Sequence, residues 1–252
     1  MKLEESQVFV NDCFNGEPAS CSFACPFGVD IRSFMERVRR GQWIPAYKMF
    51  RNSVVFPVIV SRLCPQPCRK NCQRASIGDE PLAVRDLELA CTRYARNRNP
   101  ENFVIPPKSQ SVAVIGAGPA GLSLALNLAH KKVQVRVFEK GPGWGGALRG
   151  HPDFKLFDED IALQFSAAGA EFQFNREIAS LKELEGFDAI YIATGKDGNK
   201  FGLTVNDPEL MTTASPGVFM GGALCGLPLM ESIAQGLRLS LIMEFYFQTG
   251  KA

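Results

Sequence analysis

Six of the eight cysteines of this chain lie in two tight groups, and their thiols are the side chains best suited to chemistry. Zinc sites usually pair cysteines two residues apart, and neither these spacings nor the two Cys-Pro steps fit that pattern well. Disulfides need an oxidising compartment, to which nothing in the sequence directs the chain. An iron–sulfur cluster, bound by thiolates that converge from loops, fits best, with zinc and disulfides as the alternatives. The two groups are Cys13, Cys21 and Cys25, and then Cys64, Cys68 and Cys72.

A glycine-rich turn near the middle of the chain could bind the phosphates of a dinucleotide. It follows a hydrophobic run at 111–115, and a helix over 119–130 and a strand over 133–138 are expected after it. That strand leads to Glu139, which would accept hydrogen bonds from ribose hydroxyls. This order and spacing predict a dinucleotide site with the pyrophosphate at the helix N-terminus. The G-x-G-x-x-G turn comprises Gly116, Gly118, Pro119, Ala120 and Gly121.

Two kinds of secondary structure must position these residues. Apolar side chains at helical spacing predict helices over 29–40 and 81–96, with the cysteines in loops around them. The segment 97–110 is rich in proline and polar residues and indicates a linker. The charges divide there too, because residues 1–109 carry 16 basic and 11 acidic side chains and residues 110–252 carry 12 and 15. Two modules of different chemistry are the simplest interpretation.

Composition excludes several classes of protein. With 46% hydrophobic and 21% charged residues, the 252-residue chain is neither collagen-like, a coiled coil nor wholly disordered. No run of 18 apolar residues predicts a membrane span, and the N-terminus lacks the apolar core of a secretion signal, so the cytoplasm is the expected location. The basic residues are not interleaved with aromatic residues, so we predict no nucleic-acid binding.

Three segments of the first module resemble a known helical domain. The domain is the N-terminal iron–sulfur domain of the small (beta) subunit of bacterial glutamate synthase. Dihydropyrimidine dehydrogenase and the large subunit of electron-bifurcating transhydrogenase share it. The resemblance covers roughly residues 8–96 and implies two 4Fe-4S clusters with interleaved ligands. The segments are Cys21-Ser-Phe-Ala-Cys25-Pro-Phe-Gly-Val-Asp-Ile-Arg-Ser-Phe, Leu63-Cys64-Pro-Gln-Pro-Cys68-Arg-Lys-Asn-Cys72 and Glu80-Pro-Leu-Ala-Val-Arg85-Asp-Leu-Glu88.

The resemblance also implies ligands for each cluster. Those of the first cluster are Cys25, Cys64, Cys68 and Glu88, and those of the second are Cys13, Cys21 and Cys72. Family members place Gln or Glu at the position of Glu88, for which a solvated helix face is the alternative. The family's fourth cysteine for the second cluster falls at Gly16 in this chain. The second cluster would therefore contain three irons, use Glu17 or Cys91 as a ligand, or be absent.

Three segments of the second module resemble FAD-binding segments of the same flavoproteins. They are similar to a Gly-Gly-x-Leu-Arg loop beside FAD, an Ala-Thr-Gly strand end, and a closing strand with the helix expected over 228–247. The family has Asp where this chain has Ala223, so FAD would be held less tightly or a neighbouring residue would compensate. The residues implied are Lys140, Gly145, Gly146, Leu148 and Arg149, then Ala193, Thr194 and Gly195, and then Gly222, Leu229 and Met230.

The family inserts an NADPH-binding domain between the Ala-Thr-Gly segment and the closing strand. Here only 16 residues separate Gly195 from Thr212, and no second G-x-G-x-x-G is present. A βαβ unit needs about 30 residues, so we expect no NADPH to be bound in the family manner. The predicted fold class is α + α/β, with a helical iron–sulfur domain over residues 1–109 and a reduced Rossmann-like FAD-binding domain over residues 110–252.

The resemblance implies an electron-transfer subunit of a multisubunit oxidoreductase. It would relay electrons between one or two iron–sulfur clusters and FAD, and on to a partner redox subunit. FAD accepts a hydride and releases single electrons, whereas clusters carry only single electrons. The alternatives are a structural or docking subunit with a degenerate flavin or cluster site, and a stand-alone flavin reductase of a small substrate. We predict no acid–base catalytic residue.

Overall fold

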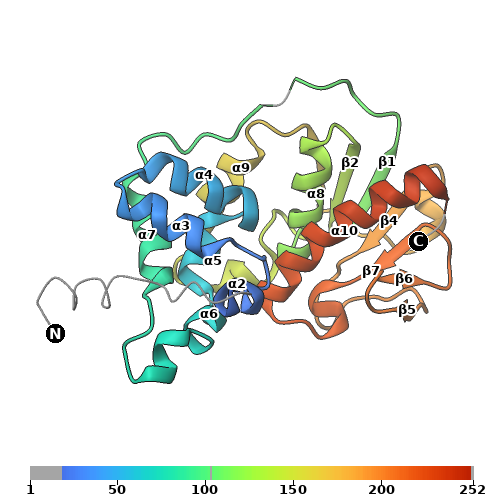
Figure 1. The fold of residues 1–252 in the computed structure, drawn as a ribbon. Coiled ribbons are helices and arrows are strands. Elements are labelled where there is room, and N and C mark those ends of the chain that lie inside the picture. Colours follow the sequence, from blue (N-terminus) through green and yellow to red (C-terminus); the bar gives the residue numbers. More distant parts are fainter. Residues whose placement is uncertain (1–18, 103, 251–252) are drawn as a thin grey trace, which may run out of the picture. The chain divides into compact units, whose positions relative to one another are not determined.

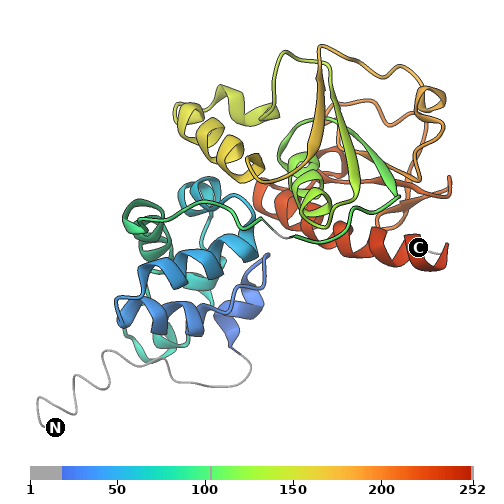
Figure 2. The ribbon, with the colours of Figure 1, turned by 90° about the horizontal axis from the view of Figure 1, so that it is seen from above.

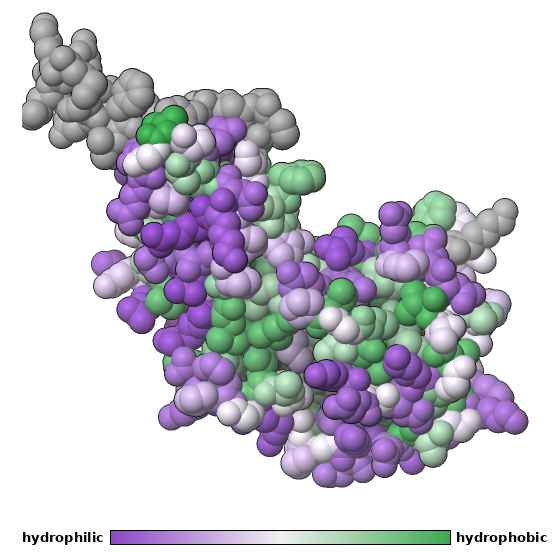
Figure 3. All heavy atoms as spheres, turned by 90° about the horizontal axis from the view of Figure 1, so that it is seen from below, coloured by the Kyte–Doolittle hydropathy of each residue, from purple (hydrophilic) through white to green (hydrophobic). Residues whose placement is uncertain are grey.

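The computed structural model describes residues 19–102 and 104–250, and the chain divides into two compact units, Met1–Arg98 and Asn99–Ala252 (Figure 1). The division falls within the segment predicted as a linker. On the face drawn in Figure 3, polar and charged side chains cover much of the surface and apolar side chains gather in smaller patches. In the two described ranges, no helix is long and apolar enough to cross a membrane.

The first unit is built from helices. The predicted helices over 29–40 and 81–96 are confirmed as α3 and α7, with shorter ends. α3 begins after Asp30, whose carboxylate accepts a hydrogen bond from the Ser33 amide, and ends before Gly41, which has a φ of 69°. The elements are α2 (Ser20–Ala24), α3 (Ile31–Arg39), α4 (Trp43–Val54), α5 (Pro57–Leu63), α6 (Pro67–Lys70), the 3-10 helix η1 (Gln73–Ile77) and α7 (Val84–Tyr94).

Large apolar side chains from α3, α4 and α5 form the core of the helical unit. Phe34, Tyr47, Phe50 and Ile59 are almost completely buried, and the ring centroids of Phe34 and Phe50 lie 6.0 Å apart. α4 packs against α3 and α7, and α5 packs against α7. This packing fixes α5 and α7, which carry or border several of the predicted ligands.

The second unit is a mixed sheet with helices. β1 covers the predicted run 111–115, and α8 covers the predicted 119–130. The predicted helix over 228–247 is confirmed as part of the longer α10. The elements are β1 (Ser111–Ile115), α8 (Pro119–His130), β2 (Gln134–Glu139), η2 (Gly146–Gly150), α9 (Phe154–Phe165), β3 (Ala170–Phe174), η3 (Leu181–Leu184), β4 (Ala189–Ile192), β5 (Val205–Asp207), β6 (Thr212–Thr213), β7 (Val218–Met220), η4 (Gly222–Cys225) and α10 (Leu229–Thr249).

The strands form one sheet in the order β3-β2-β1-β4-β7-β6-β5. The first five strands in this order are parallel, and β6 runs antiparallel to both of its neighbours. α8 and α10 lie side by side in Figures 1 and 2 and pack against each other, and α8 also contacts β1, β2 and β3. The carboxyl ends of β1 and β4 therefore share one edge, where ligands bind in sheets of this kind.

The 16 residues between Gly195 and Thr212 add to the core of this unit. Phe201, Leu203 and Val205 pack, half-buried, against the cluster that contains Ile192. The same segment supplies β5, which pairs with β6 at the edge of the sheet. The segment between Gly195 and Thr212 thus supplies core side chains and an edge strand to the second unit.

Candidate cofactor sites

The first candidate site gathers side chains from four elements of the helical unit. Cys25 follows α2, Cys64 follows α5, Cys68 lies in α6 and Glu88 lies in the middle of α7. The charge of Glu88 acts on all three thiols, and the charge of Cys25 acts on Cys64 and Cys68. The four residues predicted as ligands of the first cluster therefore lie near enough to one another for their charges to interact, although no three of them surround a single metal-ion position among the described residues.

Burial makes this site unfavourable for negative charge. Desolvation, together with a smaller effect of the Glu88 charge, raises the pKa of Cys64 to about 11 and that of Cys68 to about 12. Desolvation also raises the pKa of Glu88 to about 7, against the opposing effect of Arg85. Within the described residues, the Glu88 carboxylate accepts no hydrogen bond although only 8% of the residue is exposed. Thiols and a carboxylate buried in this way fit a site for cations.

Backbone amides point at the sulfur atoms. The amides of Phe27 and Val29 donate to the Cys25 sulfur and the amide of Gln66 donates to the Cys64 sulfur, while the Gly28 amide donates a 3.0 Å hydrogen bond to the Cys25 carbonyl. The bonds to the sulfurs lower the thiol pKa and oppose the desolvation. Gly28 has a φ of 60° and Gln66 a φ of 58°, so turns in the left-handed region aim these amides. Hydrogen bonds to ligand sulfurs are one of the means by which proteins set the potential of an iron–sulfur cluster.

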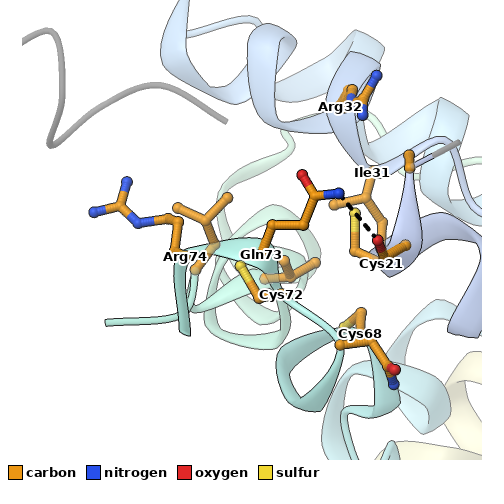
Figure 4. Close-up of a pocket in the computed structure, with 12 residues that line it drawn as sticks. Cys21, Ile31, Arg32, Cys68, Cys72, Gln73 and Arg74 are labelled. Carbon is orange, nitrogen blue, oxygen red and sulfur yellow. Dashed lines mark hydrogen bonds between the residues drawn. The ribbon is translucent and has the colours of Figure 1, made fainter. Parts of the chain in front are cut away.

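A second cysteine site is a pocket beside α2 (Figure 4). Cys21 and Cys72 line it, together with apolar side chains from Ile31 and Val84. Cys68 lines it as well, so this residue lies between the two candidate sites. The Gln73 side chain donates a 3.3 Å hydrogen bond to Ser20 Oγ and ties η1 to α2. The other residues predicted for this site, Cys13, Gly16 and Glu17, lie outside the described residues.

Cys91 lies one helical turn beyond Glu88 on α7 and is fully buried. Burial and the Glu88 charge raise the pKa of its thiol to about 12. Cys91 is not among the residues that line the pocket of Cys21 and Cys72. In the described part of the chain, no group of three or more His, Cys, Asp or Glu side chains is arranged to hold a metal ion. This finding concerns the binding of a single metal ion, whereas the four ligands of a 4Fe-4S cluster bind the cluster as a whole.

The glycine loop of the second unit contains glycines of two kinds. Gly116 has a φ of 108°, and a Cβ atom there would overlap the Ala193 carbonyl. A Cβ atom on Gly121 would overlap the Gly116 carbonyl. Gly118 has an ordinary φ of −80°, and a Cβ atom there would meet nothing within 4 Å. Packing within the chain thus requires the first and third glycines, whereas the middle one faces open space at the start of α8.

Three distant segments converge on this loop. The Gly145 amide donates a 2.8 Å hydrogen bond to the Ala117 carbonyl, and a Cβ atom on Gly146 would lie 2.9 Å from Gly118 Cα. A Cβ atom on Gly222 would lie 2.6 Å from Ala120 Cβ. With Ala193 against Gly116, the tertiary structure brings all four predicted FAD segments to one place.

Glu139 closes the loop from the end of β2. Its carboxylate accepts 2.8 Å hydrogen bonds from the amides of Ala117 and Gly141. Glu139 thus holds the glycine loop, and its contact with a ribose stays a prediction. The Thr194 hydroxyl donates a 2.9 Å hydrogen bond to the Asn199 carbonyl, so the short segment after β4 folds back on the Ala-Thr-Gly turn.

The remaining predicted residues differ in exposure. Leu148 and Met230 are buried and support the loop and α10 by packing. Lys140 and Arg149 are exposed. Arg149 donates a 3.2 Å hydrogen bond to the Trp144 carbonyl and lies over the Phe154 ring. Leu229 begins α10 and is half-buried.

Sequence analysis missed Gln235. Its Oε1 accepts a 2.6 Å hydrogen bond from the Gly222 amide, and the residue is 7% exposed. A Cβ atom on Gly221 would overlap Gln235 Oε1 and would lie 2.8 Å from the Tyr191 hydroxyl. The buried Tyr191 hydroxyl therefore lies near the Gln235 side chain. Tyr191 has no hydrogen-bond partner among the described residues. No local motif marks Gln235, because it meets Gly222 only once α10 has packed.

Comparison with known proteins finds a matching family in each of the two units. Residues 2–100 match the family described as dihydropyrimidine dehydrogenase domain II, 4Fe-4S cluster, and residues 114–171 match the NAD(P)-binding Rossmann-like domain. The NADP(+)-dependent formate dehydrogenase subunit beta of Moorella thermoacetica is 30% identical over 208 residues, which cover 70% of this chain and 29% of that protein. The glutamate synthase (NADPH) small chain of Mycobacterium tuberculosis is 34% identical over 188 residues, which cover 69% and 38%.

A third relative matches the chain to a similar extent. The NADPH-Fe(3+) oxidoreductase subunit beta of Geobacter sulfurreducens is 30% identical over 195 residues, which cover 72% of this chain and 29% of that protein. The chain therefore spans 29–38% of the length of these three relatives. The matches confirm the predicted resemblance and fold class. The chain is thus similar over residues 2–100 to the family described as dihydropyrimidine dehydrogenase domain II, 4Fe-4S cluster, and over residues 114–171 to the NAD(P)-binding Rossmann-like domain.

Proposed function

We propose that this chain is an electron-transfer subunit of a multisubunit oxidoreductase. It relays electrons between iron–sulfur clusters and FAD, and on to a partner redox subunit. The observation that carries the proposal is the union, in one chain, of a buried thiol–carboxylate site with a glycine loop on which three distant segments converge. The matched relatives, named as a subunit beta or a small chain, support a role within a complex.

Cys25, Cys64, Cys68 and Glu88 are the residues that would hold the first 4Fe-4S cluster. Their fit rests on the amides aimed at the sulfurs and on the buried carboxylate without a hydrogen bond. When bound, the cluster supplies one-electron transfer. The chain's own residues position the ligands, exclude water and set the local charge. For the second cluster we propose Cys13, Cys21 and Cys72 as ligands.

The glycine loop would hold the pyrophosphate of FAD at the N-terminus of α8. The open space at Gly118 admits a phosphate close to the backbone, and the unpaired amides of the first turn attract its charge. Three further segments, around Gly146, Thr194 and Gly222, meet this loop and favour FAD. The match to an NAD(P)-binding family favours a second candidate, in which the same loop binds NAD(P) itself.

The electron donor or acceptor would be another subunit. The 16-residue segment after Gly195 contributes β5 and core side chains, which leaves the family's inserted NADPH-binding domain without a counterpart here. We therefore propose that NADPH does not bind in the family manner. As a separate proposal, the protein acts in the cytoplasm.

The test is the cofactor content of protein purified without oxygen. We expect about one FAD, identified by chromatography after acid extraction, and roughly four to eight iron atoms with matching sulfide. Dithionite should bleach the visible absorbance, whereas NADPH alone should leave it unchanged. Iron without flavin would favour a docking subunit, and NAD(P) in the extract would favour the second candidate. Turnover of a small substrate by the isolated chain would favour a stand-alone reductase.

A further inference from the structure

Arg85 lies beside the thiol–carboxylate site formed by Cys25, Cys64, Cys68 and Glu88. It lies in the first turn of α7, three residues before Glu88, so both side chains project from the same side of the helix. Its Nη1 donates a 3.2 Å hydrogen bond to the main-chain carbonyl of Cys64, which follows α5. The guanidinium thus joins the backbone of one predicted ligand to the helix of another.

The charge of Arg85 acts on the same two ligands. It opposes the desolvation that raises the pKa of Glu88, and it lowers the pKa of Cys64. Of the charges that act on these thiols and this carboxylate, the charge on Arg85 is positive. Those on Glu88, Cys25 and Cys64 are negative when these groups are ionised. An arginine keeps its charge at every working pH. Because Arg85 is half-buried, salt screens its charge less than it screens a fully exposed charge.

We propose that Arg85 is a positioning residue that raises the reduction potential of the cluster held by Cys25, Cys64, Cys68 and Glu88. Reduction adds one negative charge to the cluster, and a fixed cation nearby stabilises the reduced state more than the oxidised one. The carboxylate ligand makes the site more negative than a set of three thiolates and a neutral ligand, and Arg85 offsets that charge. The inference rests on the proposed function, because it requires the cluster to be present.

Two substitutions separate charge from anchoring. Arg85→Gln keeps a hydrogen-bond donor and removes the charge, whereas Arg85→Lys keeps the charge and removes the planar fork. Arg93→Gln removes the same charge from an exposed position later on α7 and is the matched control. Each protein is purified without oxygen as the full chain, and iron and sulfide per chain are measured first. The midpoint potential then comes from a redox titration followed by electron paramagnetic resonance, with Cys64→Ser identifying the signal of this cluster.

We expect wild-type iron content in all three variants. The potential of Arg85→Gln should shift to a more negative value, that of Arg85→Lys should stay near wild type, and that of Arg93→Gln should not move. An unshifted Arg85→Gln, or an equal shift in Arg93→Gln, overturns the inference. Iron loss in both Arg85 variants also overturns it, because Arg85 would then only tie α5 to α7. A wild-type chain without iron overturns the proposed function, which distinguishes that failure from the others.

Discussion

The Cα atom of Gly116 faces the main-chain carbonyl of Ala193 so closely that a methyl group on Gly116 would overlap the oxygen. This approach joins the glycine loop after β1 to the turn after β4, and the φ of 108° at Gly116 adds a second demand for glycine. Two segments that are far apart in the sequence therefore meet through the backbone alone.

Gly116→Ala should destabilise the fold itself. The overlap with Ala193 and the positive φ together should lower the free energy of unfolding by roughly 3 kcal/mol, because neither backbone can move without disturbing the sheet. Chemical denaturation of protein stripped of cofactors measures this effect. A midpoint equal to that of wild type would contradict the packing described for the loop.

Gly118→Val should weaken flavin binding and change the stability of the fold only slightly. Its φ of −80° suits any residue and its Cβ atom meets nothing within 4 Å, so stability should fall by only about 1 kcal/mol through the altered helix cap. The side chain would occupy the space proposed for the pyrophosphate, and flavin affinity should fall at least about tenfold, or 1.4 kcal/mol. Full flavin occupancy in this variant would show that the flavin lies elsewhere.

Cys64→Ser and Cys68→Ser should each remove the iron of the first cluster. Because each variant deletes one of four ligands, iron should fall by about four atoms per chain while the other cluster, if bound, is retained. Iron analysis of protein purified without oxygen checks the change. Cys225→Ser, at an exposed position in η4, is the control and should keep all its iron. Unchanged iron in Cys64→Ser would refute the proposed ligand set.

Glu244→Gln should make the second unit less stable in a pH-dependent manner. Burial raises the pKa of Glu244, but hydrogen bonds from Lys108 and Lys131 outweigh it and hold the pKa below its usual value of 4.5. Since the folded-state pKa is lowered, the stabilisation is complete above pH 4.5 and is lost as the pH falls through the folded value. At pH 7 the variant should lose about 1 kcal/mol, given the partial exposure of all three groups.

Thermal unfolding from pH 7 to pH 3 measures the difference between wild type and Glu244→Gln. The two melting temperatures should converge at the acid end of this range. Glu209→Gln, at an exposed position, serves as the matched control and should follow the wild type throughout. A difference that persists at pH 3 would mean that packing, and not the ion pairs, accounts for the effect.

The sequence by itself determined the elements whose signals are local. The run 111–115, the glycines after it and the apolar periodicity of 119–130 predicted β1, the turn and α8 with their observed bounds, because a short hydrophobic run, glycine and helical spacing act within a few residues. The two cysteine groups likewise predicted a cluster domain, and residues 2–100 match a 4Fe-4S family. α4 and α5 were not predicted, because Trp43–Val54 and Pro57–Leu63 combine apolar residues with polar ones and are fixed as helices mainly by packing against α3 and α7.

Only the tertiary structure decided which residues act together. Glu88 could have been a solvated residue on a helix face, and the packing of α7 against α5 instead buries it where its charge acts on three thiols. Gln235 meets the Gly222 amide only after α10 has packed on α8. Hydrophobic periodicity fixes which face of an element is buried, but not which neighbour covers it, and the contacts that define a site depend on that neighbour.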